Sequence, residues 1–545
     1  MERACSSSHR PTSIPRTAPR TAYTRDMSTC VNSGALASHH ASLASRRENL
    51  RSRSKIIGSI KAQRSTTLLV RAGGKVTDLP DEQRVVITGA GVVSTHGDDR
   101  VEFFENLLSG KSGAVDLTAW KPGVFDDLPT RIGAPVQTLD YGTDLTAKEA
   151  RRMDRVHQYA ICAGKRALRD AGLWGADLEA VDKTRCGVLV GSAMGGMQVY
   201  EDNVMALNTK GIKKVSPFTV PYMLTNMSGA ILGMQAELGF RGPNYAGASR
   251  IEFFISSKLS PLMTLPSPMT RTRVEYSPLS PFLPPVNNTV NTACATSNYQ
   301  FINAATHIRA GQADLILAGG TEAACTKSGI GGFIACRALS SRNDDPAGAS
   351  RPWDKGRDGF VMGEGAGILC MESLAHAKKR GANILGEYLG GGISTDAYDL
   401  TAPRADGRDV ILCMRSALAD AGLEASQVDL VNAHGTSTPV GDLCEVAAIN
   451  AVFGAIDKSK FKLNSTKSML GHSLGAAGAM EAVACLQSIA TGSVHPTINH
   501  DDPEDGVDFD VCANEAQDFK VNVALSNSFG FGGHNSSVLF GAFEG

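Results

Sequence analysis

Apolar, β-branched stretches that run directly into glycine recur along the chain and predict buried strands. The first is RVVITGAGVVSTHG, from Arg84 to Gly97, where Val and Ile lead into Gly89 and Gly91. Such a run predicts a buried strand followed by a tight turn. Further strands of the same kind are predicted to begin near Cys186, Asp314, Gly365, Val428 and Val521.

Segments with helical spacing lie between these strands, among them HQYAICAGKRALRDAG and RDVILCMRSALADAG. Alternating strands and helices predict a layered α/β architecture. Both helices end in a similar A-L-x-D-A-G-L, at residues 167–173 and 417–423. This repetition indicates that the fold contains two related halves.

Residues 247–289 do not follow this pattern. They hold seven prolines, little glycine after their start and no sustained periodicity. The segment therefore predicts a loop or unstructured chain.

The composition fits a large α/β enzyme. The 545 residues are 42% hydrophobic and include 57 glycines, while aromatic residues are only 6%, which is enough apolar material for one large core or two fused ones. No run approaches ~18 uninterrupted apolar residues, so no membrane span is expected. The 12 cysteines show no repeated short spacing, which argues against a disulfide framework or a metal site and favours a reducing compartment. No phosphate-binding loop or dinucleotide fingerprint is present.

Charge is distributed unevenly along the chain. Residues 1–72 hold 13 Lys or Arg against three acids, whereas the remainder holds 41 against 52. A Ser- and Arg-rich, acid-poor start predicts an organelle transit peptide, which we assign to residues 1–74 as disordered chain. Its serine content favours a plastid over a mitochondrion; the alternative is a basic disordered tail that binds an anion.

Cys294 lies in TACATSN, where the pattern changes from extended to helical. The apolar positions Tyr299, Ile302, Ala305 and Ile308 then follow at helical spacing. At a helix N-terminus the unpaired N–H groups and the dipole favour a thiolate, and a lowered pKa would make Cys294 nucleophilic. The small neighbouring residues leave room for a substrate. The alternative is a buried structural thiol, as we expect for the other cysteines.

Two histidines have matching surroundings. His434 follows a predicted strand in NAHGTST, and His472 precedes a predicted helix in KSMLGHSLG. Each could be a satisfied core residue, but both lie at element ends beside glycine, where α/β folds collect catalytic groups and a substrate can approach closely.

The motifs TACATSN, NAHGTSTPVGD, NSTKSMLGHSLGAAGAMEA and SNSFGFGGHNS together resemble the β-ketoacyl-acyl carrier protein synthases, from about Arg84 to Phe543. They look most like the plastid enzymes of plants and algae, nearer type I than type II. The resemblance implies a thiolase-like layered α-β-α-β-α fold made of two related halves. We expect an N-terminal half at 84–340 that carries the nucleophile and a C-terminal half at 341–545 that carries both histidines.

The resemblance also implies the chemistry. An acyl group is held on Cys294 and elongated by two carbons from malonyl-carrier protein, with release of carbon dioxide. The N–H groups of Cys294 and Phe531 would form an oxyanion hole, and the glycine-flanked Phe529 and Phe531 would gate the acyl pocket. His434 and His472 would stabilise the enolate as N–H donors, and Lys467 would support the electrostatics of the site. Asp442, Glu445 and Glu481 would hold these groups in place.

The partners follow from the same resemblance. Thr436, Thr438 and Thr401 would bind the pantetheine arm of acyl carrier protein, so no cofactor and no metal is required. Acyl carrier protein is acidic, so exposed basic groups must overcome the net repulsion. The candidates for this surface are Lys148, Arg151, Arg152, Lys213 and Lys214. The resemblance implies a homodimer and implies no nucleic-acid partner.

The chain departs from the family pattern at residues 247–289. In relatives the GPNY turn leads almost directly to the nucleophile, whereas here this insert separates Gly242 from Cys294. One hypothesis is a translated intron, since a Pro-rich piece inside a buried strand would remove sheet pairing; the other is a real looped-out insertion. Transcript reads that join Ala246 directly to Val290 would support the first.

Some other functions of the same fold require different residues at these motifs. A thiolase uses a second cysteine where this chain has SNSFGFGGHNS, and type III synthases pair the cysteine with His and Asn. The alternatives are a polyketide-type ketosynthase, which keeps the Cys and both His but usually lies in a multi-module chain, and a non-elongating decarboxylating partner subunit. A non-catalytic chain-length partner typically lacks the cysteine, whereas Cys294 is present.

Overall fold

The computed structural model describes residues 75–235, 238–241 and 290–545, so the predicted transit peptide and the insert lie outside the described residues. Within these described residues, nine strands form one mixed sheet in the order β10-β9-β13-β14-β8-β1-β7-β5-β4, which divides into two sets. The first set is β4 (Cys186–Gly191), β5 (Leu315–Glu322), β7 (Gly365–Ser373) and β1 (Val85–Val93). The second is β8 (Gly386–Thr395), β14 (His534–Gly541), β13 (Val523–Gly530), β9 (Leu430–Asn432) and β10 (Lys462–Asn464).

The two sets repeat one pattern of strand pairing. β1 pairs antiparallel with β7, β7 antiparallel with β5, and β5 parallel with β4. In the same order, β8 pairs antiparallel with β14, β14 antiparallel with β13, and β13 parallel with β9. A short antiparallel pairing of Val85–Ile87 with Gly386–Tyr388 joins the sets. The two related halves expected from the sequence are therefore confirmed.

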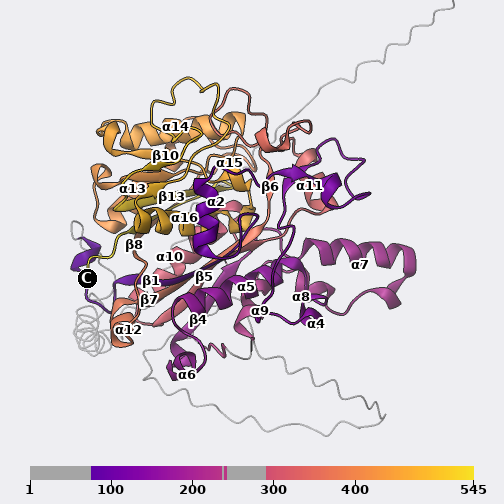
Figure 1. Cartoon of the computed structure of the whole chain (residues 1–545), viewed down its shortest axis with the longest axis horizontal. Coiled ribbons are helices and arrows are strands. Elements are labelled where there is room, and N and C mark those ends of the chain that lie inside the picture. The colour runs from indigo at the N-terminus through magenta and orange to yellow at the C-terminus, as the bar shows by residue number, and fades with distance from the viewer. Residues whose placement is uncertain (1–74, 236–237, 242–289) are drawn as a thin grey trace, which may run out of the picture. The chain divides into compact units, whose positions relative to one another are not determined.

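Helices form three layers around these two sets of strands. α5 (Arg155–Asp170) and α9 (Met227–Gly233) pack on the outer face of the first set, and α13 (Arg408–Ala421) packs on β8 and β14 of the second with α14 (Pro439–Phe453) beside it. α10 (Thr296–Arg309) and α16 (Ala477–Thr491) lie between the sets, where α16 contacts both β7 and β13. Figure 1 shows the resulting five-layer α-β-α-β-α order. This is the fold class expected from the sequence.

The repeated A-L-x-D-A-G-L segments occupy equivalent places. They close α5 and α13, and each helix lies against glycines of the first strand of its own half. A Cβ atom at Gly91 of β1 would lie 1.9 Å from the Ala163 carbonyl oxygen of α5, and one at Gly392 of β8 would lie 2.2 Å from the Cys413 carbonyl oxygen of α13. Only glycine allows helix and strand to approach so closely.

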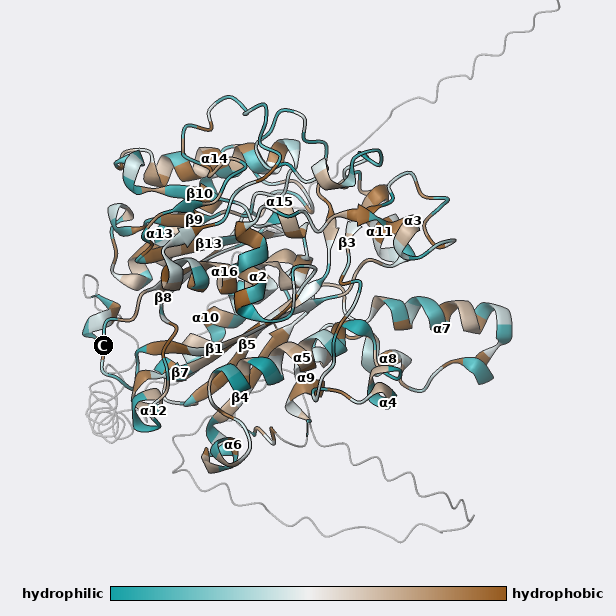
Figure 2. Ribbon diagram, in the orientation of Figure 1, coloured by the Kyte–Doolittle hydropathy of each residue, from teal (hydrophilic) through white to brown (hydrophobic). Residues whose placement is uncertain are grey.

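The remaining elements are short or peripheral. The small sheets are β2 (Val115–Asp116) with β3 (Ile132–Ala134) and β6 (Met362–Gly363), and β11 (Ser493–Val494) with β12 (Gln517–Asp518). The other helices are α2 (Arg100–Leu108), α3 (Leu117–Trp120), α4 (Ala147–Ala150), α6 (Ala176–Ala180), α7 (Met197–Lys210), α8 (Thr219–Met223), α11 (Lys327–Ala335), α12 (Leu374–Lys379) and α15 (Lys467–Leu470). Figure 2 shows hydrophobic and polar residues mixed along α7, which buries none of its residues.

One helical stretch among the described residues, Leu474–Thr491, is long and apolar enough to cross a membrane, but 83% of it is buried inside the fold. It comprises α16 and the short turn before it, in the middle layer, so packing between the two sets of strands accounts for its composition.

Two details differ from the sequence-based expectation. β7 pairs with β1 and β5, so the first half continues to Ser373 and the boundary lies between β7 and β8 instead of at residues 340/341. In α10, Tyr299 and Ile302 are only partly buried, whereas Phe301, Ala304, Ala305 and Ile308 are buried. The predicted apolar stripe was therefore only partly correct.

Candidate active site

Cys294 lies in a short 3-10 turn, Ala293–Ala295, immediately before α10. Ala293 has φ 48°, a left-handed conformation that is rare for a residue with a side chain and typical of functional turns. The end of β13 crosses this turn closely, since a Cβ atom at Gly530 would lie 2.3 Å from the Thr292 carbonyl oxygen. The backbone of the glycine-rich segment, residues 529–533, is thereby brought close to the thiol.

A single cavity of about 360 Å³ brings together groups that are far apart in the sequence. Cys294 enters it from the first half, and His434 and His472 enter it from the second. The predicted gate and arm residues also line it: Phe529, Phe531, Thr401, Thr436, Thr438, Asp442 and Glu445. Lys467 and Glu481 are not among its lining residues.

The pKa of the Cys294 thiol is raised, whereas the sequence predicted that it would be lowered. Burial raises its pKa to about 12, although the Lys467 charge and the backbone N–H groups of Phe531 and Cys294 act to lower it. The expected lowering at a helix N-terminus was wrong, because the loss of hydration outweighs these favourable contacts. The two N–H groups that act on the sulfur are the pair predicted for the oxyanion hole.

Glu322, at the end of β5, was missed by the sequence analysis. It is fully buried, and its carboxylate accepts hydrogen bonds from Ser192 Oγ and from the N–H groups of Ala193, Met194 and Gly475, at 2.9–3.2 Å overall. Burial nevertheless raises its pKa to about 7, and its charge raises the pKa of Cys294. The signal was present in AGGTEAA, where one acid follows a strand of small apolar residues.

The buried thiol predicts a steep pH dependence for alkylation. With a pKa of about 12, the thiolate fraction of Cys294 rises about tenfold per pH unit from pH 6 to 9, so its rate of modification by iodoacetamide should do the same. Peptide mass spectrometry over time measures this rate. Cys294→Ala supplies the background from the exposed Cys336. A plateau of the Cys294 rate near pH 8 would contradict the burial argument.

His434 and His472 form a pair of neutral rings. Their centroids lie 5.1 Å apart at an interplanar angle of 88°. Burial, and next the Lys467 charge, hold the pKa of each ring well below its usual range. In the described part of the chain the Nδ1 atom of each ring is buried and has no hydrogen-bond partner. Each neutral ring therefore carries one N–H, and both rings line the cavity beside Cys294.

Backbone contacts fix both histidines. Glu445 accepts the N–H groups of His434 and Gly435, both at 2.8 Å, and Asn527 Nδ2 donates to the same carboxylate at 3.1 Å. Burial raises the pKa of Glu445 to about 7. His472 donates its N–H to the Val361 carbonyl, and its own carbonyl accepts the N–H of Gly363. The ring of Phe360 lies 5.2 Å from the ring of His472.

Lys467 and Glu481 form an ion pair beneath the cavity. Both side chains are only 2% exposed, and Lys467 Nζ donates to Glu481 Oε1. Burial raises the pKa of the Glu481 carboxyl, and the Lys467 charge opposes this. The Lys467 charge also acts on Cys294 and on both histidines. Lys467 therefore influences the site through its field and does not line the cavity.

Aromatic and hydroxyl groups complete the walls. Phe531 lies 6.1 Å from Phe333, and Phe529 lies 5.3 Å from His434, measured between ring centroids. The hydroxyls of Thr436 and Thr438 are 2.9 Å apart. Thr401 lies on an exposed loop whose Leu400 carbonyl accepts the N–H of Gly532 at 2.8 Å. This contact links the loop directly to the glycine-rich segment.

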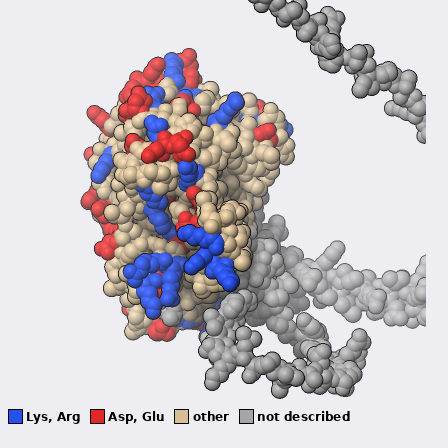
Figure 3. Space-filling model, turned by 90° about the vertical axis from the view of Figure 1, so that its right-hand side faces the viewer, with Lys and Arg blue, Asp and Glu red and all other residues tan. Residues whose placement is uncertain are grey.

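The predicted basic residues are exposed. Lys148 lies in α4 with Arg151 and Arg152 directly after it, and Lys213 and Lys214 lie in the turn Ile212–Lys214 after α7. Figure 3 shows Lys and Arg side chains gathered in several groups on the face it presents. Among the described residues, no group of three or more His, Cys, Asp or Glu side chains could hold a metal ion.

Comparison with known proteins identifies the family. The N-terminal domain model of the β-ketoacyl synthases matches residues 82–249 and 285–377, and the C-terminal domain model matches 385–501. The first match is interrupted within the predicted insert. The two models meet between residues 377 and 385, which agrees with the boundary that the strand pairing gives.

The chain is similar over most of its length to named enzymes. It is 47% identical over 485 residues to the chloroplastic 3-oxoacyl-[acyl-carrier-protein] synthase I of Arabidopsis thaliana, covering 89% of this chain and 91% of that protein. It is 45% identical over 465 residues to the chloroplastic synthase II of the same plant, covering 85% and 76%. A solved type II polyketide ketosynthase, in complex with its acyl-carrier protein, matches with a TM-score of 0.68 at 29% identity, over 84% of this chain and 99% of that chain. The chain belongs to the β-ketoacyl synthase family.

Proposed function

We propose that the chain is a β-ketoacyl-acyl carrier protein synthase that elongates fatty acids by two carbons. It condenses an acyl group held on Cys294 with malonyl-acyl carrier protein and releases carbon dioxide. The observation that carries this proposal is one cavity that holds a thiol and two neutral imidazoles from separate halves of the fold. The names of the relatives, at 47% and 45% identity, support the same activity.

In the first step Cys294 attacks the carbonyl carbon of the acyl thioester. A carbon–sulfur bond to Cys294 forms, the bond to the pantetheine sulfur breaks, and the proton of the Cys294 thiol passes to the leaving sulfur. The oxyanion that forms on the way is stabilised by the N–H groups of Cys294 and Phe531, which already act on the sulfur. Phe529 and Phe531 gate the acyl pocket.

In the second step the malonyl group loses carbon dioxide. The carbon–carbon bond to the carboxylate breaks, and its electron pair forms an enolate on the thioester. His434 and His472 each donate an N–H to the enolate oxygen, and a neutral ring has the one N–H that this needs. Lys467 adds positive potential from below, and its partner Glu481 fixes it there. Asp442 and Glu445 hold the His434 turn.

In the third step the enolate carbon attacks the acyl carbonyl on Cys294. A carbon–carbon bond forms, the carbon–sulfur bond breaks, and the Cys294 thiolate leaves and takes up a proton from water. The 3-oxoacyl product stays on the pantetheine arm, which binds to Thr436, Thr438 and Thr401. The substrates are carried on this phosphopantetheine, so the reaction needs no further cofactor.

The partners and location are part of the proposal. Acyl carrier protein docks on Lys148, Arg151, Arg152, Lys213 and Lys214. The chain forms a homodimer, which exposed apolar residues of the α7–α8 region, among them Phe218 (52%) and Val220 (63%), support as an interface. The protein acts in the plastid stroma after removal of residues 1–74, in keeping with its chloroplastic relatives.

The test uses the full chain and an acyl-carrier-protein thioester. We expect a protein mass increase equal to one acyl group, located on Cys294, and a 3-oxoacyl product two carbons longer after addition of malonyl-acyl carrier protein. Release of carbon dioxide without an acyl mass on Cys294 would identify a non-elongating decarboxylating partner. Repeated elongation without reduction would identify a polyketide-type ketosynthase.

A further inference from the structure

The segment Arg351–Arg357 carries three buried charged side chains, Arg351, Asp354 and Arg357, none of which lines the cavity. The side chain of Arg357 is only 3% exposed. Its Nε donates to the Thr438 carbonyl at 3.2 Å and its Nη2 donates to the Pro439 carbonyl at 3.0 Å. Its Nη1 donates to the Asp354 carbonyl at 2.8 Å and to Glu504 Oε2 at 2.6 Å. One planar guanidinium therefore holds two consecutive carbonyls of the turn that carries Thr436 and Thr438.

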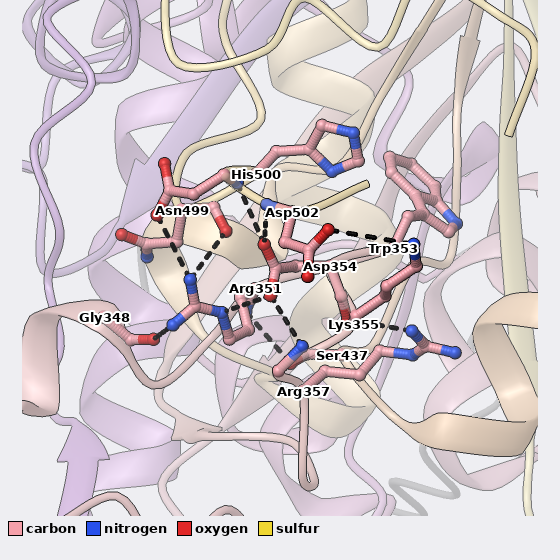
Figure 4. Close-up of polar contacts among 12 residues, drawn as sticks. Gly348, Arg351, Trp353, Asp354, Lys355, Arg357, Ser437, Asn499, His500 and Asp502 are labelled. Carbon is pink, nitrogen blue, oxygen red and sulfur yellow. Dashed lines mark hydrogen bonds and ion pairs between the residues drawn. The ribbon is translucent and has the colours of Figure 1, made fainter. Parts of the chain in front are cut away.

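The segment itself is fixed from the opposite side. Asp354 Oδ1 accepts Arg351 Nε at 2.9 Å and the Gly356 N–H at 2.7 Å, and its Oδ2 accepts the N–H groups of Asp501 and Asp502 at 2.9 and 2.8 Å. Figure 4 shows Arg351 and Asp354 facing each other, with Asn499 and Asp502 beside them. Every oxygen of this buried carboxylate has two donors, so the base from which Arg357 extends is rigid.

The turn at residues 436–438 has a strained backbone that the surrounding hydrogen bonds must hold in place. Ser437, between the two threonines, has φ 68°, which is unfavourable for a residue with a side chain. Its hydroxyl accepts the Arg351 N–H at 2.9 Å, and its carbonyl accepts the Gly359 N–H at 3.2 Å. Asp442 accepts the N–H groups of Trp353 and Thr438, at 3.0 and 3.3 Å. The turn is thus held by one connected network that runs through residues 351–359.

We propose that Arg357 is a positioning residue for the pantetheine arm: by fixing the Thr438 and Pro439 carbonyls, it holds the Thr436 and Thr438 hydroxyls in the orientation that binds the arm. This inference rests on the proposed function and adds a residue that does not itself line the cavity. Arginine suits the role because its N–H groups lie on separate atoms of a rigid plane and reach two acceptors in fixed directions, whereas the three N–H groups of an ammonium share one nitrogen and rotate.

The test separates arm binding from folding. Arg357→Gln should raise KM for malonyl-acyl carrier protein about tenfold and leave kcat within about threefold, since binding is lost and the chemistry is not. The same rise should occur with malonyl-pantetheine, which lacks the carrier protein. The rate of Cys294 alkylation by iodoacetamide, which uses no arm, should stay within about twofold of the wild-type rate.

Controls make the outcome decisive. Arg309→Gln removes another part-buried arginine that bonds Asp420 and a backbone carbonyl, away from the cavity, and should leave KM unchanged. Arg357→Lys keeps the charge but loses the fork, so its KM should stay raised. Should Arg357→Gln fail to fold, Glu504→Gln loosens the same guanidinium from a more exposed position (23%) and should raise KM about two- to threefold.

An unchanged KM in Arg357→Gln, a wild-type KM in Arg357→Lys, or an equal loss of alkylation rate would each overturn the inference while the condensing activity of the wild-type enzyme stands. A wild-type enzyme without condensing activity would instead refute the proposed function.

Discussion

Replacing Cys294 with alanine is expected to abolish condensation, by about 10⁴-fold or more, while the release of carbon dioxide from malonyl-acyl carrier protein continues. The two activities separate because the thiol comes from the turn before α10, whereas the histidines come from the loops after β9 and before α16. No hydrogen bond in the described residues joins the thiol to either ring, so removing the sulfur leaves both rings in place.

The measurement has two readouts. Intact-protein mass spectrometry should find no acyl adduct on Cys294→Ala, and carbon dioxide release should stay within about tenfold of the wild-type rate. Cys186→Ala is the matched control, since burial also raises the pKa of that thiol to about 12 but Cys186 lies in β4 and is not a cavity-lining residue. The control should condense normally. An acyl adduct elsewhere on Cys294→Ala, with condensation retained, would show that another group is the nucleophile.

The strands and the two halves could be predicted because their signals are local. Apolar runs followed by glycine marked β1, β4, β5, β7, β9 and β13, and all six are present. β8, β10 and β14 were not predicted, and GEYLGGGIST, which forms β8, resembles a loop. Its glycines are needed where α13 packs closely on the strand, which is a tertiary requirement that a local pattern does not reveal. The boundary between the two halves was misplaced for a related reason. β7 belongs to the first half because it pairs with β1 and β5, and this pairing is visible only in the folded chain.

For the site too, features that depend on short motifs could be predicted, whereas features that depend on tertiary contacts could not. Cys294, His434 and His472 were found from short motifs, and the structure brings all three to one cavity. The pKa of Cys294 could not be predicted correctly, because burial by distant elements overrides the local helix end. Glu322 was missed since its four donors come from segments at 192–194 and 475 that meet it only in the folded chain.

Replacing either histidine with alanine is expected to lower decarboxylation and condensation by about 10²–10³, the usual effect of removing one donor to a developing oxyanion. Acyl transfer to Cys294 should fall by less than about tenfold, because the oxyanion hole proposed for that step consists of the backbone N–H groups of Cys294 and Phe531, which neither ring supplies. Single-turnover acylation followed by carbon dioxide release measures the two steps separately. His434→Asn and His472→Asn keep an N–H donor and should retain part of the decarboxylation.

The pH profile tests the charge state of the rings. Burial keeps the pKa of both below 6.5, so they stay neutral from pH 8 down to pH 6.5 and the decarboxylation rate constant should be flat over that range. Below about pH 6.5 the unfolded chain binds protons at these histidines and the folded chain does not, so folding stability should fall as the pH drops further. A rate that instead rises as the pH falls through 6.5 would mean that cationic imidazoles stabilise the enolate. Two positive rings 5.1 Å apart above the Lys467 charge would then need a compensating anion, and Glu445, which contacts the His434 backbone, would be the first residue to test by mutation to Gln.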